Sequence, residues 1–153
     1  MIELYKGDAK RIQHFCKVHS YAKLIAETEN VDEKCLFTIE AAALTHDIGI
    51  HFCEEKYGNC NGKLQEQEGP AIAERLLKKL GFDQEVSDRV QYLIAHHHTY
   101  NNINEIDYQI LVEADFLVNI MEDGLTKEAA LKSYHSIFRT ACGKMICKEM
   151  FDI

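Results

Sequence analysis

The sequence predicts an all-α protein, a single compact domain of about six to seven helices. Apolar residues recur at intervals of three and four along nearly the whole chain, which is the period of amphipathic helices. The 153 residues include a single proline, which disfavours a turn-rich β architecture. The chain contains no internal repeat, linker or low-complexity tract, and its length is typical of one domain.

Capping residues and breaks in the apolar period define the expected helices. Asp8, Asp83 and Thr126 are suited to N-terminal caps, Pro70 to a first helical turn, and Gly81 to a helix end. Helices are expected over residues 9–26, 32–45, 70–80, 84–98, 106–121, 127–138 and 141–151. Between Asp47 and Gln67, glycines and asparagines interrupt the pattern and predict a long loop. Loops of this length in a compact domain are usually functional or contain short structure of their own.

Charge and hydropathy exclude several classes of function. The chain has 25 acidic and 17 basic residues and a net charge of -8, which disfavours a binder of nucleic-acid polymers. No apolar run approaches the roughly 20 residues that cross a bilayer, and the N-terminus lacks the apolar core of a signal peptide. We therefore expect a cytoplasmic protein without membrane contacts.

The six cysteines are scattered and form no C-x-x-C pair. Several have apolar neighbours, where a free thiol packs as a small hydrophobic group. We therefore expect reduced thiols. A zinc site from Cys53 and Cys60 is a minor alternative, because their spacing fits no standard zinc finger.

The eight histidines are the strongest compositional signal. His46 and Asp47 are adjacent where the second helix gives way to the expected loop. His14 lies on a mostly apolar helix, and Asp115 lies in so apolar a segment that its carboxylate needs a partner or a metal. Each taken alone also fits a structural role, such as a hydrogen-bonded core histidine or a salt-bridged aspartate. Together, on helices that must pack side by side, they predict a site for a divalent transition ion.

Three motifs carry a family resemblance. They are Arg11-Ile-Gln-His14-Phe-Cys-Lys-Val18, then Ala-Leu-Thr-His46-Asp47-Ile-Gly, then Glu-Ala-Asp115-Phe-Leu. In this order they resemble the H…HD…D pattern of the HD-domain superfamily of metal-dependent phosphohydrolases, over about residues 8–122. The resemblance implies an all-helical fold in which His14, His46, Asp47 and Asp115 hold one tightly bound divalent ion. Manganese, iron, cobalt, nickel and zinc all suit such a mixed nitrogen and oxygen donor set.

Superfamily members with two metals suggest a second group of donors. Ile94-Ala-His-His97-His98-Thr99 matches their additional histidine motif, whereas Gln65 stands where they have another histidine. A glutamine carbonyl is a weaker, oxygen-only ligand. Gln65, His97 and His98 are therefore expected to hold a weak second ion or the substrate phosphate. The chain also lacks the Gly-Tyr-Pro extension of the cyclic dinucleotide phosphodiesterases, which disfavours that branch.

The resemblance further implies hydrolysis of a small, nucleotide-like phosphate ester. Asp47 is expected to act both as a ligand and as the proton acceptor from a metal-bound water. Lys63 and His97 are candidate catalytic groups that contact the phosphate, with Lys56 and His98 as other candidates. Tyr57, Lys63 and Tyr100 are the predicted substrate-binding residues. For Lys63, a solvated loop lysine is an equally good interpretation.

Two other functions remain open at the sequence level. One is a ligand-sensing module that keeps the metal but does not turn over a substrate. The other is an HD-type di-iron oxygenase, which Gln65 disfavours because it weakens the second metal site. Residues 125–153 carry no recognisable chemistry and are expected to form either a packing surface or a homodimer surface.

Overall fold

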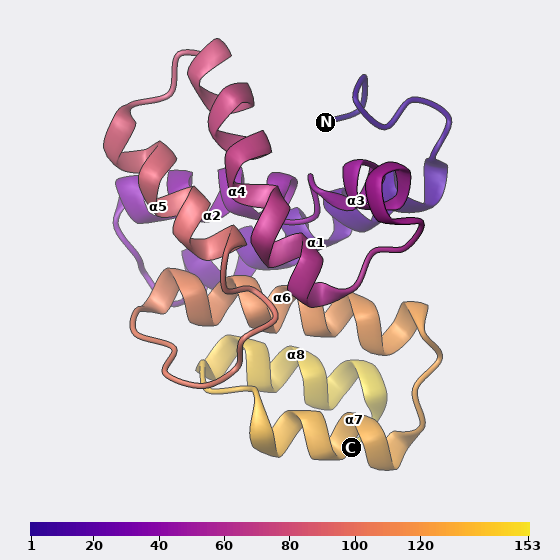
Figure 1. Cartoon of the computed structure of the whole chain (residues 1–153). Helices are drawn as coiled ribbons and strands as arrows, with labels where there is room; N and C mark the ends of the chain where they lie inside the picture. The colour runs from indigo at the N-terminus through magenta and orange to yellow at the C-terminus, as the bar shows by residue number, and fades with distance from the viewer.

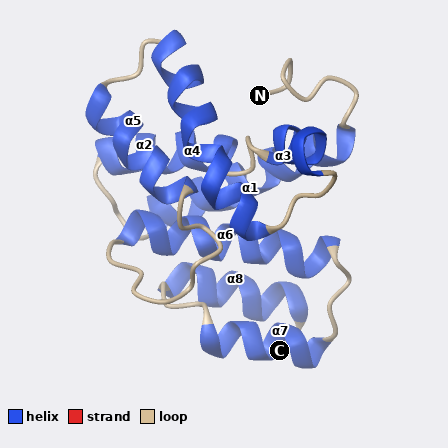
Figure 2. Cartoon of the chain, in the orientation of Figure 1, coloured by secondary structure: helices blue, strands red, loops and turns tan.

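The computed structural model describes all 153 residues and contains eight helices and no strand, which confirms the predicted fold class (Figures 1 and 2). The helices are α1 (Ala9–Thr28), α2 (Glu33–Thr45), α3 (Ile50–Tyr57), α4 (Gly62–Lys79), α5 (Gln84–Ile94), α6 (Ile106–Glu122), α7 (Lys127–Ser136) and α8 (Ala141–Phe151).

Side-chain caps start most of these helices. Asp8 accepts a hydrogen bond from the backbone N–H of Arg11 at 3.1 Å, and Thr126 caps α7 in the same way, as the sequence predicts. Asp83 occupies the N-cap position of α5, but its side chain makes no capping hydrogen bond. Gly81 follows α4 with φ of +77°, a left-handed conformation that favours glycine at a helix end.

The segment between Asp47 and Gln67 differs from the expected long loop. It contains α3 and the first turns of α4, which Asn61 caps by accepting from the N–H of Leu64. Pro70 consequently lies inside α4 and not in its first turn. The helix continues through the proline because only one backbone hydrogen bond is lost there, while the turns that follow it, with Ala73 and Leu77, are packed in the core.

Helix α6 is the centre of the molecule. Twelve of its 17 residues are buried, including Asp107, Glu113 and Asp115. Helices α1 and α2 pack on one side of it, whereas α7 and α8 lie on the other (Figure 1). Helices α4 and α5 form an antiparallel pair, and α5 packs on α2. The first part of α1, the end of α2 and the middle of α6 are thereby brought together.

Glycines bring the α3–α4 region close to this meeting point. A Cβ atom on Gly49 would lie 3.2 Å from the Cα of Gly69, and one on Gly69 would lie 2.7 Å from the Cγ2 of Ile94. These contacts leave room only for hydrogen, so the start of α3 and the end of α5 both approach α4 closely. Gln65, one turn before Gly69, is thereby placed near the histidines that follow α5.

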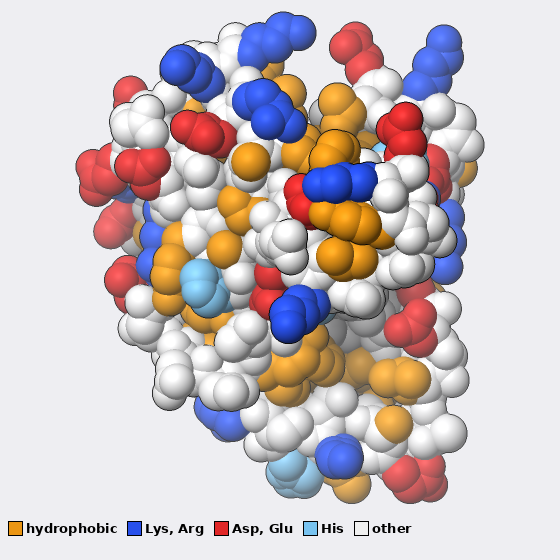
Figure 3. All heavy atoms as spheres, in the orientation of Figure 1, with side chains coloured by type: hydrophobic (Ala, Val, Ile, Leu, Met, Phe, Trp, Pro, Cys, Tyr) orange, Lys and Arg blue, Asp and Glu red, His pale blue; other side chains and the backbone are white.

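No helix combines the length and the apolar character that crossing a bilayer requires. On the face in Figure 3, acidic side chains border both flanks of the molecule, in keeping with the net charge of -8.

Candidate metal centre

Four side chains from three helical segments converge at one point. His14 lies on α1, His46 is the C-cap of α2 and is followed by Asp47, and Asp115 lies in the middle of α6. His14 Nε2 is 3.3 Å from His46 Nε2, 3.6 Å from Asp47 Oδ2 and 3.2 Å from Asp115 Oδ1. His46 Nε2 is 3.5 Å from each of the same two oxygens. Donors about 2.1 Å from a shared tetrahedral ion lie about 3.4 Å apart, so this spacing fits a metal ion.

Asp115 provides an independent test of the fit. Its Oδ1 atom is buried and has no hydrogen-bond partner in the protein. An unpaired carboxylate oxygen in an apolar interior is costly unless a cation or a donor satisfies it. The unpaired oxygen faces the Nε2 atoms of His14 and His46. These donors therefore suit a divalent ion of the kind that binds imidazole and carboxylate together.

Hydrogen bonds from the opposite ring nitrogens orient both imidazoles. His46 Nδ1 lies 2.9 Å from the carbonyl oxygen of Ala43, and His14 Nδ1 lies 3.1 Å from Glu122 Oε2. Because both partners only accept hydrogen bonds, each Nδ1 carries a proton, so Nε2 faces the centre and is the nitrogen that would bind a metal once it is deprotonated. The two imidazole nitrogens and two carboxylate oxygens are therefore the four candidate ligand atoms.

Charge distribution at the centre favours a cation. Burial opposes protonation of His46, but the neighbouring Asp47 and Asp115 outweigh it and raise its pKa to about 9. Burial disfavours the ionised form of Asp47, yet His46 and His97 hold the pKa of its carboxyl below the usual value. Positive charge is thus stabilised where the four residues meet. Tyr5, fully buried, holds the backbone here by donating to the carbonyl oxygen of Asp47 at 2.8 Å.

A second group of donors adjoins the first and shares Asp47. His97 Nε2 lies 3.6 Å from Asp47 Oδ1, and His98 belongs to the same cluster of potential metal ligands. Gln65 Oε1 lies 3.3 Å from His97 Nε2 and 3.0 Å from His98 Nε2. Burial, together with the charge of His97, lowers the pKa of His98 to about 4, so this ring is neutral at pH 7. The structure therefore brings together the three residues expected to hold a second ion or a phosphate, Gln65, His97 and His98.

A cavity of about 640 Å³ opens beside the four ligands. Its walls come mainly from the start of α1 and the end of α6, and two of its lining residues, His14 and Asp47, are candidate ligands. The other lining residues are Asp8, Lys10, Arg11, Ile50, Cys60, Gln65, Asn119, Glu122 and Asp123. Only two residues of the lining are apolar, so the cavity suits a polar ligand.

Several of these residues were not identified from the sequence as part of a site. Lys10 and Asn119 line the cavity, and Glu122 contacts a candidate ligand directly. Helical spacing contained part of this information, because Glu122 follows Asp115 by seven residues, about two turns, and so lies on the same face of α6. Arg11 belongs to the motif around His14, but its guanidinium group is held by Asp8 and Glu54 at 2.7 and 2.5 Å.

The other expected substrate contacts lie in different places. Tyr57 is exposed and donates to Glu68 at 2.5 Å, and Lys56 pairs with the same carboxylate at 3.3 Å. Lys63 is exposed on the first turn of α4, and neither Lys63 nor Tyr57 lines the cavity. Tyr100 is closer to the donors, because its hydroxyl lies 3.4 Å from His98 Nδ1. Burial and the nearby charge of Asp115 raise the pKa of Tyr100 to about 12.

All six cysteines are free thiols, in agreement with the sequence-based expectation. Cys53 is buried and Cys60 lines the cavity beside the ligands. Burial raises the pKa of the Cys60 thiol to about 12, aided by the neighbouring Cys53. A thiol with a pKa this high stays protonated at pH 7 in the metal-free protein, which makes it a poor nucleophile there.

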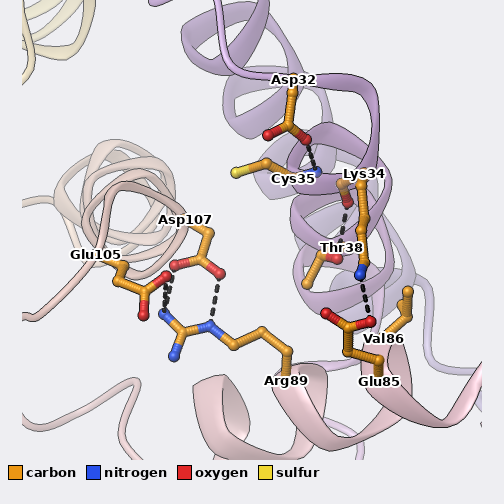
Figure 4. A pocket seen from close by; sticks show the side chains of 9 residues that line it. All are labelled: Asp32, Lys34, Cys35, Thr38, Glu85, Val86, Arg89, Glu105 and Asp107. Carbon is orange, nitrogen blue, oxygen red and sulfur yellow. Dashed lines mark hydrogen bonds and ion pairs between the residues drawn. The ribbon is translucent and has the colours of Figure 1, made fainter.

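A second polar cavity, of about 350 Å³, lies between α2, α5 and the start of α6 (Figure 4). Its charged groups are already paired. Arg89 donates two hydrogen bonds to Asp107, at 2.7 and 2.6 Å, and Lys34 pairs with Glu85. Because these charged groups are already paired, we interpret them as ion pairs that link neighbouring helices. In this they differ from the metal centre, where the oxygen of Asp115 is unpaired.

Comparisons with known proteins agree with this geometry. A family model described as the HD domain matches residues 11–132, which is most of the chain. A crystal structure of a predicted HD superfamily hydrolase from an uncultured Thermotogales bacterium is similar, with 26% sequence identity and a TM-score of 0.68. That match covers 98% of this chain and 80% of the other. No curated protein matches the chain. The family model, the matching fold and the ordered histidine and aspartate motifs together show that this chain belongs to the HD domain family.

Proposed function

We propose that the protein is a metal-dependent phosphohydrolase that acts on a small, nucleotide-like phosphate ester. The observation that carries the proposal is the unpaired, buried Oδ1 of Asp115, which faces two imidazole nitrogens beside a polar cavity of about 640 Å³. A cavity of this size is in the range that holds small ligands. The similar crystal structure is described as a predicted hydrolase, which supports the same reaction class.

In this proposal, His14, His46, Asp47 and Asp115 hold the ion. A divalent ion held by such ligands supplies Lewis acidity and lowers the pKa of a coordinated water molecule. Asp47 is the carboxylate best placed to take up a proton, because its two oxygens face different groups. Its Oδ2 faces His14 and His46, whereas its Oδ1 faces His97.

The groups around the cavity support a phosphate ester as the substrate. Lys10 is exposed and makes no ion pair, which leaves its ammonium group free for an anion. The amides of Gln65 and Asn119 add neutral hydrogen-bonding groups of the kind that contact sugars and bases. Tyr100, beside His98, offers an aromatic ring at the edge of the second donor group. These contacts favour a nucleoside monophosphate over a more highly charged substrate, because Asp8, Glu122 and Asp123 also line the cavity.

The second donor group favours binding of a second ion, weaker than the first. Asp47, His97 and His98 can contribute ligand atoms to a shared point, and Gln65 adds a carbonyl oxygen. The same atoms are equally suited to a substrate phosphate if His97 or His98 donates its proton. Metal titration distinguishes a second metal site from a phosphate site, since only a second metal site adds a further ion to the protein in the absence of substrate.

The proposal is tested by measuring hydrolysis of a panel of phosphate esters by the manganese- or cobalt-loaded protein. The panel should contain nucleoside 5′-monophosphates and sugar phosphates, whose hydrolysis releases inorganic phosphate, and cyclic nucleotides, whose hydrolysis is followed as formation of the nucleoside monophosphate. Two histidines on α1 provide a matched pair of variants. His14→Ala should lose both bound metal and activity, whereas His19→Ala should keep both, because His19 pairs with Glu40 away from the centre.

Failure of the metal-loaded protein to hydrolyse any compound of the panel would contradict the hydrolase assignment and favour a ligand-sensing module. Activity confined to sugar phosphates would contradict only the nucleotide-like substrate. Metal retained by His14→Ala at the wild-type level would contradict the centre itself.

A further inference from the structure

We propose that Glu122 is a positioning residue for metal binding, which holds His14 with its Nε2 lone pair directed at the ion. The inference rests on the metal centre of the proposed function and adds a residue that would act on the metal through His14. Glu122 is the last residue of α6 and follows Asp115 by about two helical turns. The same helix therefore supplies one ligand and the carboxylate that orients another.

Both nitrogens of the His14 imidazole face carboxylates. Nδ1 lies 3.1 Å from Glu122 Oε2, and Nε2 lies 3.2 Å from Asp115 Oδ1. A carboxylate can only accept a hydrogen bond, so the Nδ1 proton belongs to this contact and Nε2 remains free to bind a metal. Carboxylates that accept from the outer nitrogen of a ligating histidine fix both its tautomer and the orientation of its ring.

His14 differs in this respect from His46 and His97. The Nδ1 atoms of His46 and His97 lie 2.9 and 2.7 Å from the backbone carbonyls of Ala43 and Ile94. Backbone carbonyls are present whatever the side chain, so these two rings are oriented by the helix ends themselves. His14 lies inside α1, where backbone carbonyls are already used, and it depends on a side chain from another helix.

Lys17 holds the carboxylate in place. Its ammonium group donates to Glu122 Oε1 at 2.9 Å, which leaves Oε2 for His14. The side chain of Glu122 is only 12% exposed, so water competes weakly for these contacts. A carboxylate at the C-terminal end of a helix is disfavoured by the helix dipole. Glu122 therefore does not serve the stability of α6, which is consistent with a role toward His14.

The same helix offers a matched control. His19, also on α1, lies 3.0 Å from Glu40 Oε1, and Lys23 donates to the same oxygen at 3.1 Å. This is a second group of histidine, glutamate and lysine, with similar distances but without any metal ligand. Replacing Glu40 by glutamine thus reproduces the chemical change at Glu122 without touching the centre.

The test is titration of the metal-free protein with Co²⁺, which reports affinity and, through its visible absorption spectrum, the ligand field. Wild type, Glu122→Gln, Glu40→Gln and His46→Ala are compared. We expect Glu122→Gln to weaken Co²⁺ binding by roughly 10- to 100-fold and to shift the spectrum at saturation. Glu40→Gln should match wild type in Co²⁺ affinity and in the spectrum at saturation. Lys17→Met should weaken binding in the same direction by a smaller factor.

The outcomes separate this inference from the proposed function. Wild-type affinity and spectrum in Glu122→Gln, with metal lost in His46→Ala, would overturn the role of Glu122 and leave the centre intact. No Co²⁺ binding by wild type would overturn both. Urea unfolding of the metal-free variants measures whether Glu122→Gln also destabilises the fold. If Glu122→Gln unfolds at a clearly lower urea concentration than Glu40→Gln and its saturated spectrum is unchanged, the positioning role is also overturned.

Discussion

Thr140 and Glu113 are joined in the interior of the protein, where the Thr140 hydroxyl donates to Glu113 Oε2 at 2.5 Å. The backbone N–H groups of Arg139 and Thr140 donate to the other oxygen of Glu113, at 2.5 and 2.9 Å, and so does the amide of Gln109, at 2.7 Å. Glu113 is fully buried on α6, and Thr140 caps α8. A single carboxylate therefore attaches the C-terminal helices to the central helix.

Removing the hydroxyl from this contact should destabilise the fold. Thr140→Val loses the hydrogen bond to the charged Glu113 and the cap on the N–H of Gly143, at an expected cost of about 2–3 kcal/mol in the free energy of unfolding. Urea denaturation measures the change. Thr28→Val is the control, because Thr28 is exposed and bonds only within its own helix. Equal stability of the two variants would contradict the attachment through Glu113.

Gln65 should determine how tightly a second ion binds. Gln65→His replaces a carbonyl oxygen with an imidazole nitrogen beside Asp47, His97 and His98, and we expect the variant to bind two Co²⁺ or Zn²⁺ ions per chain more tightly than wild type. Metal titration followed by elemental analysis gives the stoichiometry. Gln67→His is the control, because Gln67 is exposed two residues further along α4. An unchanged second affinity in Gln65→His would argue against a second metal site.

Gly62 should be required for the position of His98. A Cβ at residue 62 would lie 2.7 Å from Cγ and 2.8 Å from Cδ2 of the His98 ring. At an open helical position, replacing glycine by alanine stabilises by about 1 kcal/mol. At residue 62 we expect the opposite: alanine should lower the free energy of unfolding by about 1–3 kcal/mol, because the His98 ring must move. Urea denaturation of Gly62→Ala decides the sign. The exposed neighbour Lys63→Ala should leave stability nearly unchanged.

The cap of α1 should make stability depend on acidity. The N–H of Arg11 and its guanidinium group lower the pKa of Asp8 from 3.8 to about 2. The stabilisation from the ionised carboxylate is therefore complete above pH 4 and is lost as the pH falls from about 4 to 2. Asp8→Asn keeps a capping group but not the charge. Its unfolding free energy should be lower than that of wild type by about 0.5 kcal/mol at pH 6, and the difference should shrink at pH 3. A difference that is constant with pH would contradict this account.

The sequence alone was sufficient for much of the fold, because helix formation is largely local. The stripe on α1, the cap at Thr126 and the apolar run of α6 each depend on neighbouring residues, and these helices appear as predicted. The segment around α3 was misjudged for the same reason. Its glycines indicate a loop locally, but Gly49 and Gly69 allow helices to approach one another, which depends on distant parts of the chain.

The sequence by itself determined the helical class, the family resemblance and the choice of His14, His46, Asp47 and Asp115 as candidate ligands. Only the tertiary structure decided that the two imidazole nitrogens lie 3.2–3.6 Å from each other and from the carboxylate oxygens, that Asp115 Oδ1 is unpaired, and that Lys10 rather than Lys63 lines the cavity. It also placed Glu122 against His14, 108 residues away along the chain. The physical reason is that periodicity and capping fix which face of a helix is apolar, whereas contacts between helices follow from packing the whole chain.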